Sequence, residues 1–394
     1  MENYKIIEHC RASDIADSQF IPLFTMEPIP MAGSFCDSYE EAIDSPLIPF
    51  SLVVNKDTGL MQCLEDVNSD LIYKKYKYRS SEIPALVKHF AGLAGTMVKR
   101  YGHWANFKLL EIGSNDNPLL NQLPLNWDLV GVDPSDVAKN AKRNGNIELY
   151  NTYFSHEFVL KKKLFDFDVV TASNCLAHNN SILAMMYGAF YALRDGGEFW
   201  IEVKDGESLM NLGAWDDLYS EHPALWTVDS LKLVLGRIGF QYVQHEILPF
   251  HGGLIRMCVK KMGEDFEFSY PLPEDYFINL INKWSEIQKD YDSRYEDILV
   301  KKLLSDPANV AWGASGKASV LLSALNKVRF SYIVDDSPSK QGKYLPHTGI
   351  PIVGKHVLET EVEEKNVLVT AWNYFDNIVE NNKHIENANW CRFF

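Results

Sequence analysis

The sequence predicts an α/β protein with two open sheets, preceded by a small irregular N-terminal part. From about residue 86 to 262, apolar strand-like runs alternate with helical patterns, and from residue 309 the same alternation starts again. In each series, a glycine-containing turn directly follows the first strand. Because alternating strands and helices build parallel sheets with helices on both faces, we expect two Rossmann-like domains in one chain.

A chain of 394 residues is longer than one hydrophobic core usually supports, so several domains are expected. We place an N-terminal domain at residues 1–85, a central domain at 86–262 and a C-terminal domain at 263–394. Prolines interrupt the short strand-like runs of the first domain, such as Phe50 to Val54. We therefore expect this domain to be irregular.

The apolar pattern predicts the elements of the two Rossmann-like domains. In the central domain we expect helices at Ile83 to Arg100 and Val228 to Ile238, and strands near 108–112, 129–133, 167–172, 198–203 and 255–260. In the C-terminal domain we expect a helix through Leu321 to Leu325 and strands at Asn309 to Trp312, Phe330 to Val334 and Val367 to Thr370. Residues 274 to 304 repeat apolar side chains at steps of three and four, which predicts one long amphipathic helix that packs against the protein.

The composition is typical of a soluble globular protein, with 46% hydrophobic and 23% charged residues. A formal net charge of −15 argues against general binding to nucleic acids or membrane surfaces, so an anionic ligand needs a local cluster of cations or backbone N–H groups. We find no cationic leader and no apolar run of membrane-spanning length. The six cysteines are scattered without a Cys-x-x-Cys pair, as reduced thiols usually are. We therefore expect a cytoplasmic enzyme.

The glycine turn of the central domain has the features of an adenosyl-binding site. The strand that contains Glu111 leads into Gly113, whose missing Cβ lets the backbone approach a ligand closely. About twenty residues later the next strand ends in Asp133, a carboxylate that can accept hydrogen bonds from both ribose hydroxyls. On this basis we expect Glu111 and Gly113 beside the amino-acid half of the ligand and Asp133 beside its ribose.

The same turn favours S-adenosylmethionine over a nicotinamide cofactor. A nicotinamide site needs Gly-x-Gly-x-x-Gly to hold a pyrophosphate, but Asn115 and Pro118 occupy the second and third glycine positions. S-adenosylmethionine has no phosphate to hold. The residues expected to bind it lie in this turn and at the neighbouring strand ends: Glu111, Gly113, Asn115, Asp133 and Asn174.

Several segments occur in an order that resembles one known family: Glu111 to Asp116, Ala172 to His178, Tyr219 to His222, Pro249 to Gly253, Trp312 to Lys317, and Val334 to Pro346 continuing to Gly349 to Ile352. Together they resemble the sugar C-methyltransferases that build branched deoxysugars on nucleotide carriers, over nearly the whole chain. The resemblance implies a class I S-adenosylmethionine methyltransferase domain in the centre and a C-terminal domain that binds the nucleotide sugar. It also implies methyl transfer to C3 of a nucleotide-linked 4-keto-deoxysugar through an enolate, which requires a base and hydrogen-bond donors.

The resemblance places the catalytic residues around Tyr219 to His222. We expect His222 to be the base, because imidazole titrates near neutral pH, with Glu221 beside it to orient the ring or hold a sugar hydroxyl. Donors to the enolate or to sugar hydroxyls are expected from Tyr78, Tyr219 and His178. Tyr76 and His251 are expected on the substrate side. A core tyrosine is the alternative for Tyr76 and Tyr78, and a simple turn is the alternative for His251.

The second glycine turn is a candidate site for the diphosphate of the nucleotide sugar. Gly313 to Lys317 opens a helix, and the N–H groups at a helix N-terminus bind anions. We expect Gly313 to contact the diphosphate and Lys317 to be its counter-ion. Lys340 and Lys343 lie in a later loop and are expected to serve the same purpose; a solvated lysine loop is the alternative.

The N-terminal domain departs from the family pattern, which usually contains two Cys-x-x-Cys pairs suited to zinc. Here Cys10 has Ser13 in place of its partner, and Asn55 and Thr58 occupy the positions of the second pair. One thiolate of four cannot make a structural zinc site, so we expect no metal.

Two other functions stay open. One is an O- or N-methyltransferase, or another C-methyltransferase, that acts on a different sugar or on a non-sugar metabolite. The other is a non-catalytic subunit that binds S-adenosylmethionine, although the intact set of Glu111, Gly113, Asp133 and His222 argues against it. We expect a nucleotide-sugar substrate, no nucleic-acid or membrane partner, and a monomer or weak homo-oligomer.

Overall fold

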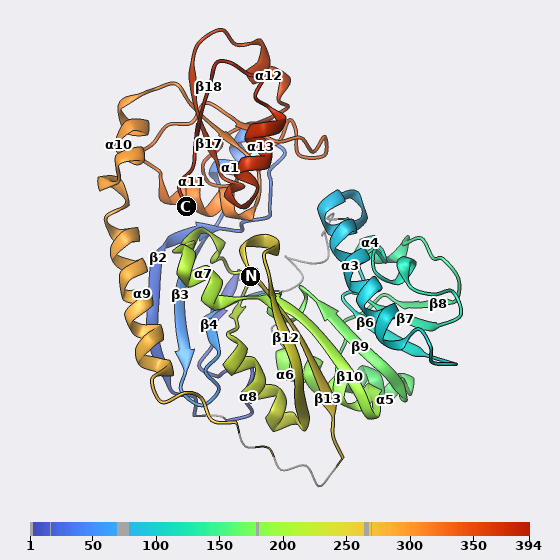
Figure 1. Ribbon diagram of the computed structural model, residues 1–394. Helices are drawn as coiled ribbons and strands as arrows, with labels where there is room; N and C mark the ends of the chain where they lie inside the picture. The colour runs from blue at the N-terminus through green and yellow to red at the C-terminus, as the bar shows by residue number, and fades with distance from the viewer. Residues whose placement is uncertain (1–2, 16, 69–78, 179–180, 264–267, 269) are drawn as a thin grey trace.

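The computed structural model describes residues 3–15, 17–68, 79–178, 181–263, 268 and 270–394 (Figure 1). The strands are β1 (Tyr4–Ile6), β2 (Phe20–Pro30), β3 (Leu47–Asn55), β4 (Met61–Cys63), β5 (Glu65–Val67), β6 (Lys108–Ile112), β7 (Asp128–Val132), β8 (Ile147–Tyr150), β9 (Phe167–Ser173), β10 (Leu193–Lys204), β11 (Ala224–Leu225), β12 (Phe240–Leu248), β13 (Leu254–Lys261), β14 (Asn309–Trp312), β15 (Ile333–Val334), β16 (Ile352–Val353), β17 (Lys365–Val369) and β18 (Ala388–Cys391).

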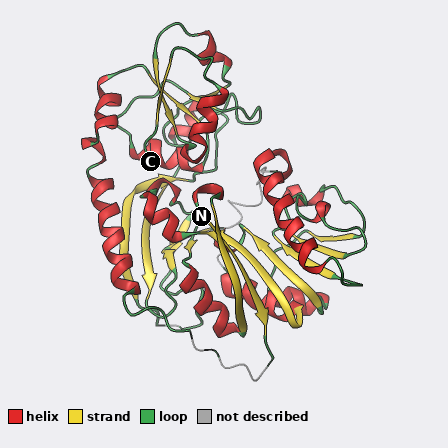
Figure 2. Ribbon diagram, in the orientation of Figure 1, coloured by secondary structure: helices red, strands yellow, loops and turns green. Residues whose placement is uncertain are grey.

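The α-helices are α1 (Tyr39–Ile43), α3 (Pro84–Tyr101), α4 (Asp136–Lys139), α5 (His156–Lys162), α6 (Ile182–Ala192), α7 (Gly206–Leu212), α8 (Val228–Ile238), α9 (Tyr276–Asp292), α10 (Ile298–Ser305), α11 (Gly316–Ala324), α12 (His356–Thr360) and α13 (Phe375–Asn381). Short 3-10 helices are η1 (Ser80–Glu82), η2 (Leu120–Gln122), η3 (Leu176–His178), η4 (Trp215–Asp217), η5 (Phe250–Gly252), η6 (Arg294–Glu296) and η7 (Trp372–Tyr374). Figure 2 shows how helices and strands alternate through the fold. Among the described residues, no helix combines the length and apolar character needed to cross a lipid bilayer.

The central sheet has the strand order β12-β13-β10-β9-β6-β7-β8. Strand β13 runs antiparallel to β12 and β10, and the pairs from β10 to β8 are parallel. The strands predicted for this domain are all present, which confirms the first Rossmann-like sheet. The sequence pattern does not predict β8 and β12, because most of their residues are half-exposed or exposed and so show no apolar alternation.

Helices cover both faces of this sheet (Figure 1). On one face, α3 packs on Leu109, Val169 and Trp200. On the other face, residues of α5, α6 and α8 join a core that includes Ile112 and Ile201. The chain runs outward from β6 to β8 and then returns to β9, so the direction of winding changes between the carboxyl ends of β6 and β9. In open α/β sheets, ligands bind at that point.

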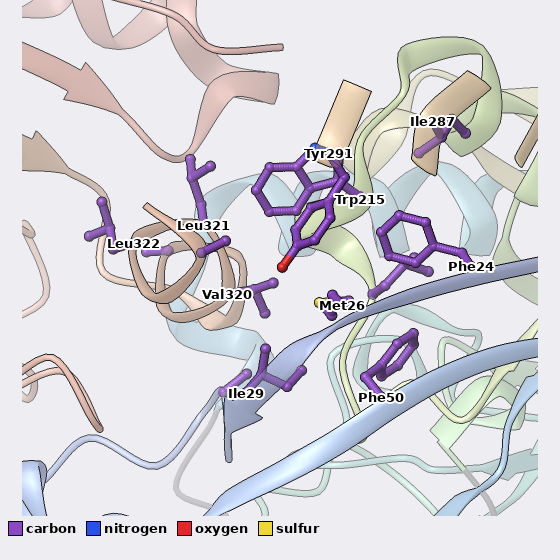
Figure 3. Packing of buried hydrophobic residues seen from close by; sticks show 14 of the residues in the cluster. Phe24, Met26, Ile29, Phe50, Trp215, Ile287, Tyr291, Val320, Leu321 and Leu322 are labelled. Atoms are coloured by element: carbon purple, nitrogen blue, oxygen red, sulfur yellow. The ribbon is translucent and has the colours of Figure 1, made fainter. Parts of the chain in front are cut away.

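The N-terminal part forms a separate sheet of order β11-β4-β3-β2, in which β11 comes from the central domain. Helix α9 packs on this sheet, where Trp284 and Tyr291 contact the ring of Phe24 in β2. Figure 3 shows Phe24 and Tyr291 in one cluster with apolar side chains of α11 from the C-terminal domain. The N-terminal sheet therefore shares its core with helices that follow much later in the sequence.

The single helix predicted for residues 274–304 is wrong, because the chain breaks between α9 and α10. The side chain of Asp297 accepts hydrogen bonds from the backbone N–H groups of Leu299 at 2.8 Å and Val300 at 3.1 Å, so it caps a new helix. Ile298, which the periodicity places in the apolar stripe, is 87% exposed. The local capping interaction decides the structure here against the helical periodicity.

The C-terminal sheet has the order β16-β15-β14-β17-β18 with every pair parallel, which confirms a second Rossmann-like domain. Helix α11 begins at the glycine turn, where Ser315 caps it by accepting a hydrogen bond from the Ala318 N–H at 3.3 Å. The strand predicted at Phe330 to Val334 is reduced to β15. Helix α1 of the N-terminal part lies against this domain, where the Ala42 carbonyl accepts a bond from the His347 N–H at 2.7 Å.

Candidate active site

At the switch point of the central sheet, the face that packs on α3 changes from apolar to polar. Toward the carboxyl ends of β6, β9 and β10, the apolar side chains give way to Glu111, Thr171, Ser173 and Glu202. Glu111 lies opposite Thr171 in the β6–β9 pair, and Ser173 lies opposite Glu202 in the β9–β10 pair. Because opposite residues of a sheet point to the same face, these polar side chains form one surface at the expected ligand site.

Glu111 is the most unusual group on this surface. It is 1% exposed, and its Oε2 atom has no hydrogen-bond partner among the described residues. Burial, together with the negative charges of Asp133 and Glu202, raises the pKa of Glu111 well above its usual range. A buried carboxyl group without a partner is costly, and a cationic ligand would compensate it.

These groups fit S-adenosylmethionine, which carries positive charge on its ammonium and sulfonium groups. The Glu111 carboxyl group offers an acceptor of opposite charge once a bound cation causes it to lose its proton. The buried hydroxyl oxygens of Ser114, Thr171 and Ser173 also have no partner within the described part of the chain. The predicted amino-acid half of the site is therefore lined by polar atoms that have the chemistry to bind it.

The glycine turn supports the predicted ribose-binding residue. Asp133 accepts hydrogen bonds from the backbone N–H groups of Asn115 at 2.9 Å and Ser135 at 2.8 Å, which fix its carboxylate at the end of β7. Gly113 has a φ of +74°, and a Cβ there would lie 2.7 Å from the Cβ of Cys175, so only glycine fits. Asn174 follows β9 with a φ of 55°, and its N–H donates to the Glu202 carbonyl at 2.8 Å.

A cavity of about 200 Å³ lies between Ser114 of the glycine turn and the end of β8. Its lining residues are Ser114, Ala138, Lys139, Arg143, Leu149, Tyr150 and Asn151. Asn151 ties the cavity to the turn, because its side-chain amide donates to the Asp133 carbonyl at 3.0 Å. The structure therefore brings the predicted cofactor residues together at one edge of the sheet, with a cavity beside Ser114 of the glycine turn.

Sequence analysis does not identify the ion-pair network next to this surface. The Glu202 carboxylate contacts His89 Nε2 at 2.9 Å and Arg256 Nε at 2.6 Å. Burial alone would raise the pKa of Glu202, but His89 and Arg256 outweigh it and lower that pKa. The sequence indicates this polar surface through the alternating polar residues near the ends of β9 and β10, but it does not indicate the ion pairs themselves.

The predicted base lies at the junction of the central and C-terminal domains. His222 Nε2 is 3.0 Å from the Tyr219 hydroxyl, and His222 Nδ1 is 3.4 Å from the Asp217 carbonyl. A carbonyl can only accept, so the neutral imidazole carries its proton on Nδ1 and accepts from Tyr219 at Nε2. This tautomer presents Nε2 as a basic nitrogen.

Two partly buried lysines meet at Asp217. Its Oδ2 atom lies 2.6 Å from Lys204 Nζ and 3.1 Å from Lys317 Nζ, and the Lys317 ammonium also lies 4.2 Å from the centre of the Trp372 ring. The predicted counter-ion Lys317 is thus paired with a carboxylate of the central domain. Trp372 donates its indole N–H to Asp216 at 2.9 Å, so the same junction joins two adjacent aspartates to the C-terminal domain.

Two regions of the chain match families of known proteins. Residues 77–245 match a methyltransferase domain, and they contain Glu111, Asp133 and the polar strand ends. Residues 281–393 match a C-methyltransferase C-terminal domain. The chain is an S-adenosylmethionine-dependent methyltransferase. Its central sheet has the strand order of the class I methyltransferase fold, as predicted.

The methyltransferase is similar over nearly its whole length to one curated protein. It is 25% identical to "C-methyltransferase NovU" of Streptomyces niveus over 399 aligned positions, which cover 97% of this chain and 94% of that protein. Among solved structures, it is similar to magnesium protoporphyrin IX methyltransferase ChlM of Synechocystis PCC 6803 (12% identity, 44% of this chain and 83% of that chain, TM-score 0.36). N-methyltransferase NodS of Bradyrhizobium japonicum WM9 gives 13% identity, 45% and 88% coverage, and a TM-score of 0.36.

The other predicted site residues of the methyltransferase lie in several places. Glu221 accepts a hydrogen bond from the Gly33 N–H at 3.0 Å and so fastens the N-terminal part beside His222. His251 has a φ of 50°, its carbonyl accepts from Lys204 at 2.8 Å, and burial together with the charge of Lys317 lowers its pKa to about 4. Tyr76 and Tyr78 lie outside the described residues; His178 ends η3, but its side chain also lies outside them.

The predicted anion-binding groups of the C-terminal domain are only partly together. Gly313 has a φ of +102°, and a Cβ there would lie 2.8 Å from the Cβ of Ala371. Lys340 lies beside this glycine turn and donates to the Ala314 carbonyl at 2.7 Å. Lys343 instead pairs with Asp37 of the N-terminal part at 2.5 Å.

In the methyltransferase, hydrogen bonds connect the positions at which the family usually has zinc-binding cysteines. Cys10 Sγ lies 3.4 Å from the Thr58 hydroxyl, which lies 3.0 Å from Asn55 Oδ1. Burial raises the pKa of Cys10, so its sulfur is a thiol and not a thiolate. Within the described ranges, no group of three or more His, Cys, Asp or Glu side chains is placed to hold a metal ion. One thiol with a hydroxyl and an amide does not fit a zinc site.

Proposed function

We propose that this methyltransferase transfers the methyl group to C3 of a nucleotide-linked 4-keto-deoxysugar, with His222 as the base. The match to a C-methyltransferase C-terminal domain and the similarity to "C-methyltransferase NovU" both favour carbon as the acceptor. The observation that carries the proposal is the contact of 3.0 Å between Tyr219 and His222 Nε2 at the domain junction. A carbon acceptor needs such a base, because the C–H proton must leave before the carbon atom can attack the methyl group.

The chemistry of the acceptor defines what the protein must do. S-adenosylmethionine supplies a methyl group that is already activated by the positive charge on sulfur. A carbon atom becomes nucleophilic only after it loses a proton, and a neighbouring carbonyl group makes the C3 proton acidic. The residues of the chain must therefore accept that proton and stabilise the negative charge on the carbonyl oxygen.

His222 and Tyr219 together can meet both requirements. Nε2 takes the C3 proton, the C–H electron pair forms the C3–C4 double bond, and the carbonyl π electrons move to the oxygen. For this step the Tyr219 hydroxyl, 3.0 Å from Nε2, must turn from Nε2 to the carbonyl oxygen of the substrate. This frees the Nε2 lone pair for the C3 proton and lets Tyr219 donate to the enolate oxygen. The Asp217 carbonyl, 3.4 Å from Nδ1, favours the tautomer that this step needs.

The diphosphate of the substrate requires local positive charge, because the chain as a whole has a net charge of −15. Lys340 lies beside the glycine turn of the C-terminal domain, where its ammonium group contacts the Ala314 carbonyl at 2.7 Å and the Asp335 carboxylate at 3.0 Å. We assign the diphosphate to this turn, with Gly313 allowing close approach and Lys340 as counter-ion. Lys317 is closer to the base and shares its charge with Asp217.

Exchange of the C3 proton with solvent tests the proposal. The enzyme is incubated in deuterated water with S-adenosylhomocysteine and a panel of nucleotide 4-keto-sugars, and the C3 proton is followed by NMR. We expect loss of this signal with the wild-type enzyme and at least about a hundredfold slower loss with His222→Gln, as is typical for removal of a general base.

The chain offers a matched control for this experiment. Tyr242 and His245 form a second tyrosine–histidine pair three residues apart, at 2.8 Å, on the exposed strand β12. We expect the His245→Gln enzyme to exchange the C3 proton of the sugar at the wild-type rate. No exchange with any sugar, while S-adenosylhomocysteine still binds, would contradict the proposal and favour an O- or N-methyltransferase.

A further inference from the structure

Asp217 connects the C-terminal domain to the base through two different groups. Its side chain binds Lys317 of α11 at 3.1 Å and Lys204 of β10 at 2.6 Å. Its backbone carbonyl lies 3.4 Å from His222 Nδ1. A change in either lysine therefore acts on the same residue that contacts the imidazole ring.

The junction is buried, so charges there act on one another with little screening. The side chain of Asp217 is 5% exposed and that of Lys317 is 13% exposed. Among the described residues, the titratable and charged groups near Asp217 and His222 include Lys204 of β10, Asp216 of η4, Tyr219, His251 of η5 and Lys317 of α11, and Glu221 precedes His222 in the chain. Of these, the two lysines are the cations that neutralise Asp217.

We propose that Asp217 is the positioning residue of His222, and that Lys317 sets the negative charge that Asp217 presents to the imidazole. The carboxylate favours the protonated imidazole, whereas Lys317 reduces that influence. Because Lys317 belongs to the C-terminal domain, the basicity of His222 depends on how that domain is seated on the central domain. This inference rests on the proposed function only for the role of His222 as the base.

The proposal gives opposite signs for two substitutions. Asp217→Asn removes a negative charge near the imidazole, so it should lower the pKa of His222 by about 0.5 to 1 unit. Lys317→Met removes a positive charge and leaves Asp217 less neutralised, so it should raise the pKa of His222 by a similar amount. A merely structural role for either residue would not shift the same titration in opposite directions.

The experiment is an NMR titration of the imidazole in the ligand-free enzyme, with the His222 signal assigned from its loss in His222→Gln. Lys365→Met is the matched control, since Lys365 is also 13% exposed and paired with glutamates, but at a distant place in the C-terminal domain. It should leave the titration unchanged. Binding of S-adenosylhomocysteine by each variant shows that the central domain is folded.

The pH profile of C3 exchange is the second readout, and its acid limb should shift in the same two directions. If the titration shifts as expected but the wild type exchanges no proton, the positioning role stands and the proposed function fails. If the wild type exchanges the proton but both variants titrate like the control, the positioning role is overturned and the proposed function stands. Should Asp217→Asn not fold, an unshifted Lys317→Met titration alone contradicts the proposal.

Discussion

At the scale of single residues, Glu111 lowers the stability of the ligand-free protein and is expected to strengthen the binding of S-adenosylmethionine. It is buried at the end of β6 with one carboxylate oxygen unpaired among the described residues, and burial raises its pKa. In the folded protein the group holds its proton at pH values where the unfolded chain has lost it. Its contribution to stability therefore decreases as the pH rises from the unfolded pKa toward the folded pKa.

The substitution Glu111→Gln should change stability and cofactor affinity in opposite directions. We expect the ligand-free variant to be more stable than the wild type by about 1 to 3 kcal/mol at pH 7.5, because a neutral amide replaces a buried carboxyl group without a partner. Binding of S-adenosylmethionine should become about 10- to 100-fold weaker, because the compensating charge is lost.

Thermal unfolding and calorimetric titration measure these two effects on the same samples. The exposed Glu363, changed to Gln, serves as the control and should alter neither quantity. Unchanged affinity in Glu111→Gln would remove Glu111 from the cofactor site, whatever its effect on stability.

The sequence predicts the position of a site residue most directly when that residue lies in a local motif at the end of a strand. Gly113 and Asp133 lie at strand ends, so a motif of local spacing locates them. His89 and Asp217 could not be found in this way, because their partners Glu202 and Lys317 are about a hundred residues away in the sequence. Only the folded sheet and the domain junction bring such pairs together.

At the scale of elements, apolar runs predict the inner strands of both Rossmann-like domains but not β8, β12, β16 and β18, and the long helix does not follow from its periodicity. Helices α9 and α10 keep their apolar spacing across the break, so the pattern contains no interruption. The break depends on Asp297, whose carboxylate competes for backbone N–H groups as capping residues do. A single polar side chain thus decides where one element ends and the next begins.

Removing this cap should destabilise the start of α10. We expect Asp297→Ala to cost about 1 kcal/mol, because two backbone N–H groups lose their acceptor. Hydrogen–deuterium exchange of the segment 298–305, read by mass spectrometry, should become faster. Asp292→Ala, at the other side of the break, removes a carboxylate from the end of α9, where it opposes the helix dipole, and should not destabilise. Equal effects of both substitutions would argue against a specific cap.

The loop that carries Asn55 and Thr58 gives a prediction about metal content. Since Cys10 is a buried thiol beside a hydroxyl and an amide, we expect well below one zinc per chain by elemental analysis of the purified protein. Treatment with a chelator should leave the unfolding temperature unchanged. Stoichiometric zinc, or a chelator-dependent loss of stability, would contradict the hydrogen-bonded arrangement.

At the scale of the whole molecule, the junction around Asp216 links stability to pH. Burial raises the pKa of Asp216 to about 7, while Lys317 acts in the opposite direction. The folded protein therefore keeps this proton up to near neutral pH, whereas the unfolded chain loses it near pH 4. Stability should decrease as the pH rises between these two values and become constant above the folded pKa.

Asp216→Asn should remove this dependence while keeping an acceptor for Trp372. Relative to the wild type, the variant should gain about 2 kcal/mol in unfolding free energy between pH 5.5 and pH 8, since each pKa unit crossed is worth about 1.4 kcal/mol. Denaturant unfolding at both pH values measures the difference. Asp376→Asn, on the exposed side of α13, should show no such gain; an equal gain in both variants would refute the assignment.

The pairing of β11 with β4 has a consequence for how the chain is made. The edge of β4 receives its neighbour only when Ala224 and Leu225 have been synthesised, about 160 residues after Cys63. At ordinary rates of translation, this interval lasts on the order of ten seconds, during which the nascent N-terminal strands present an unpaired edge. A ribosome that stalls before Ala224 therefore carries an aggregation-prone fragment, and chaperones that bind exposed strands should act on this protein chiefly in that period.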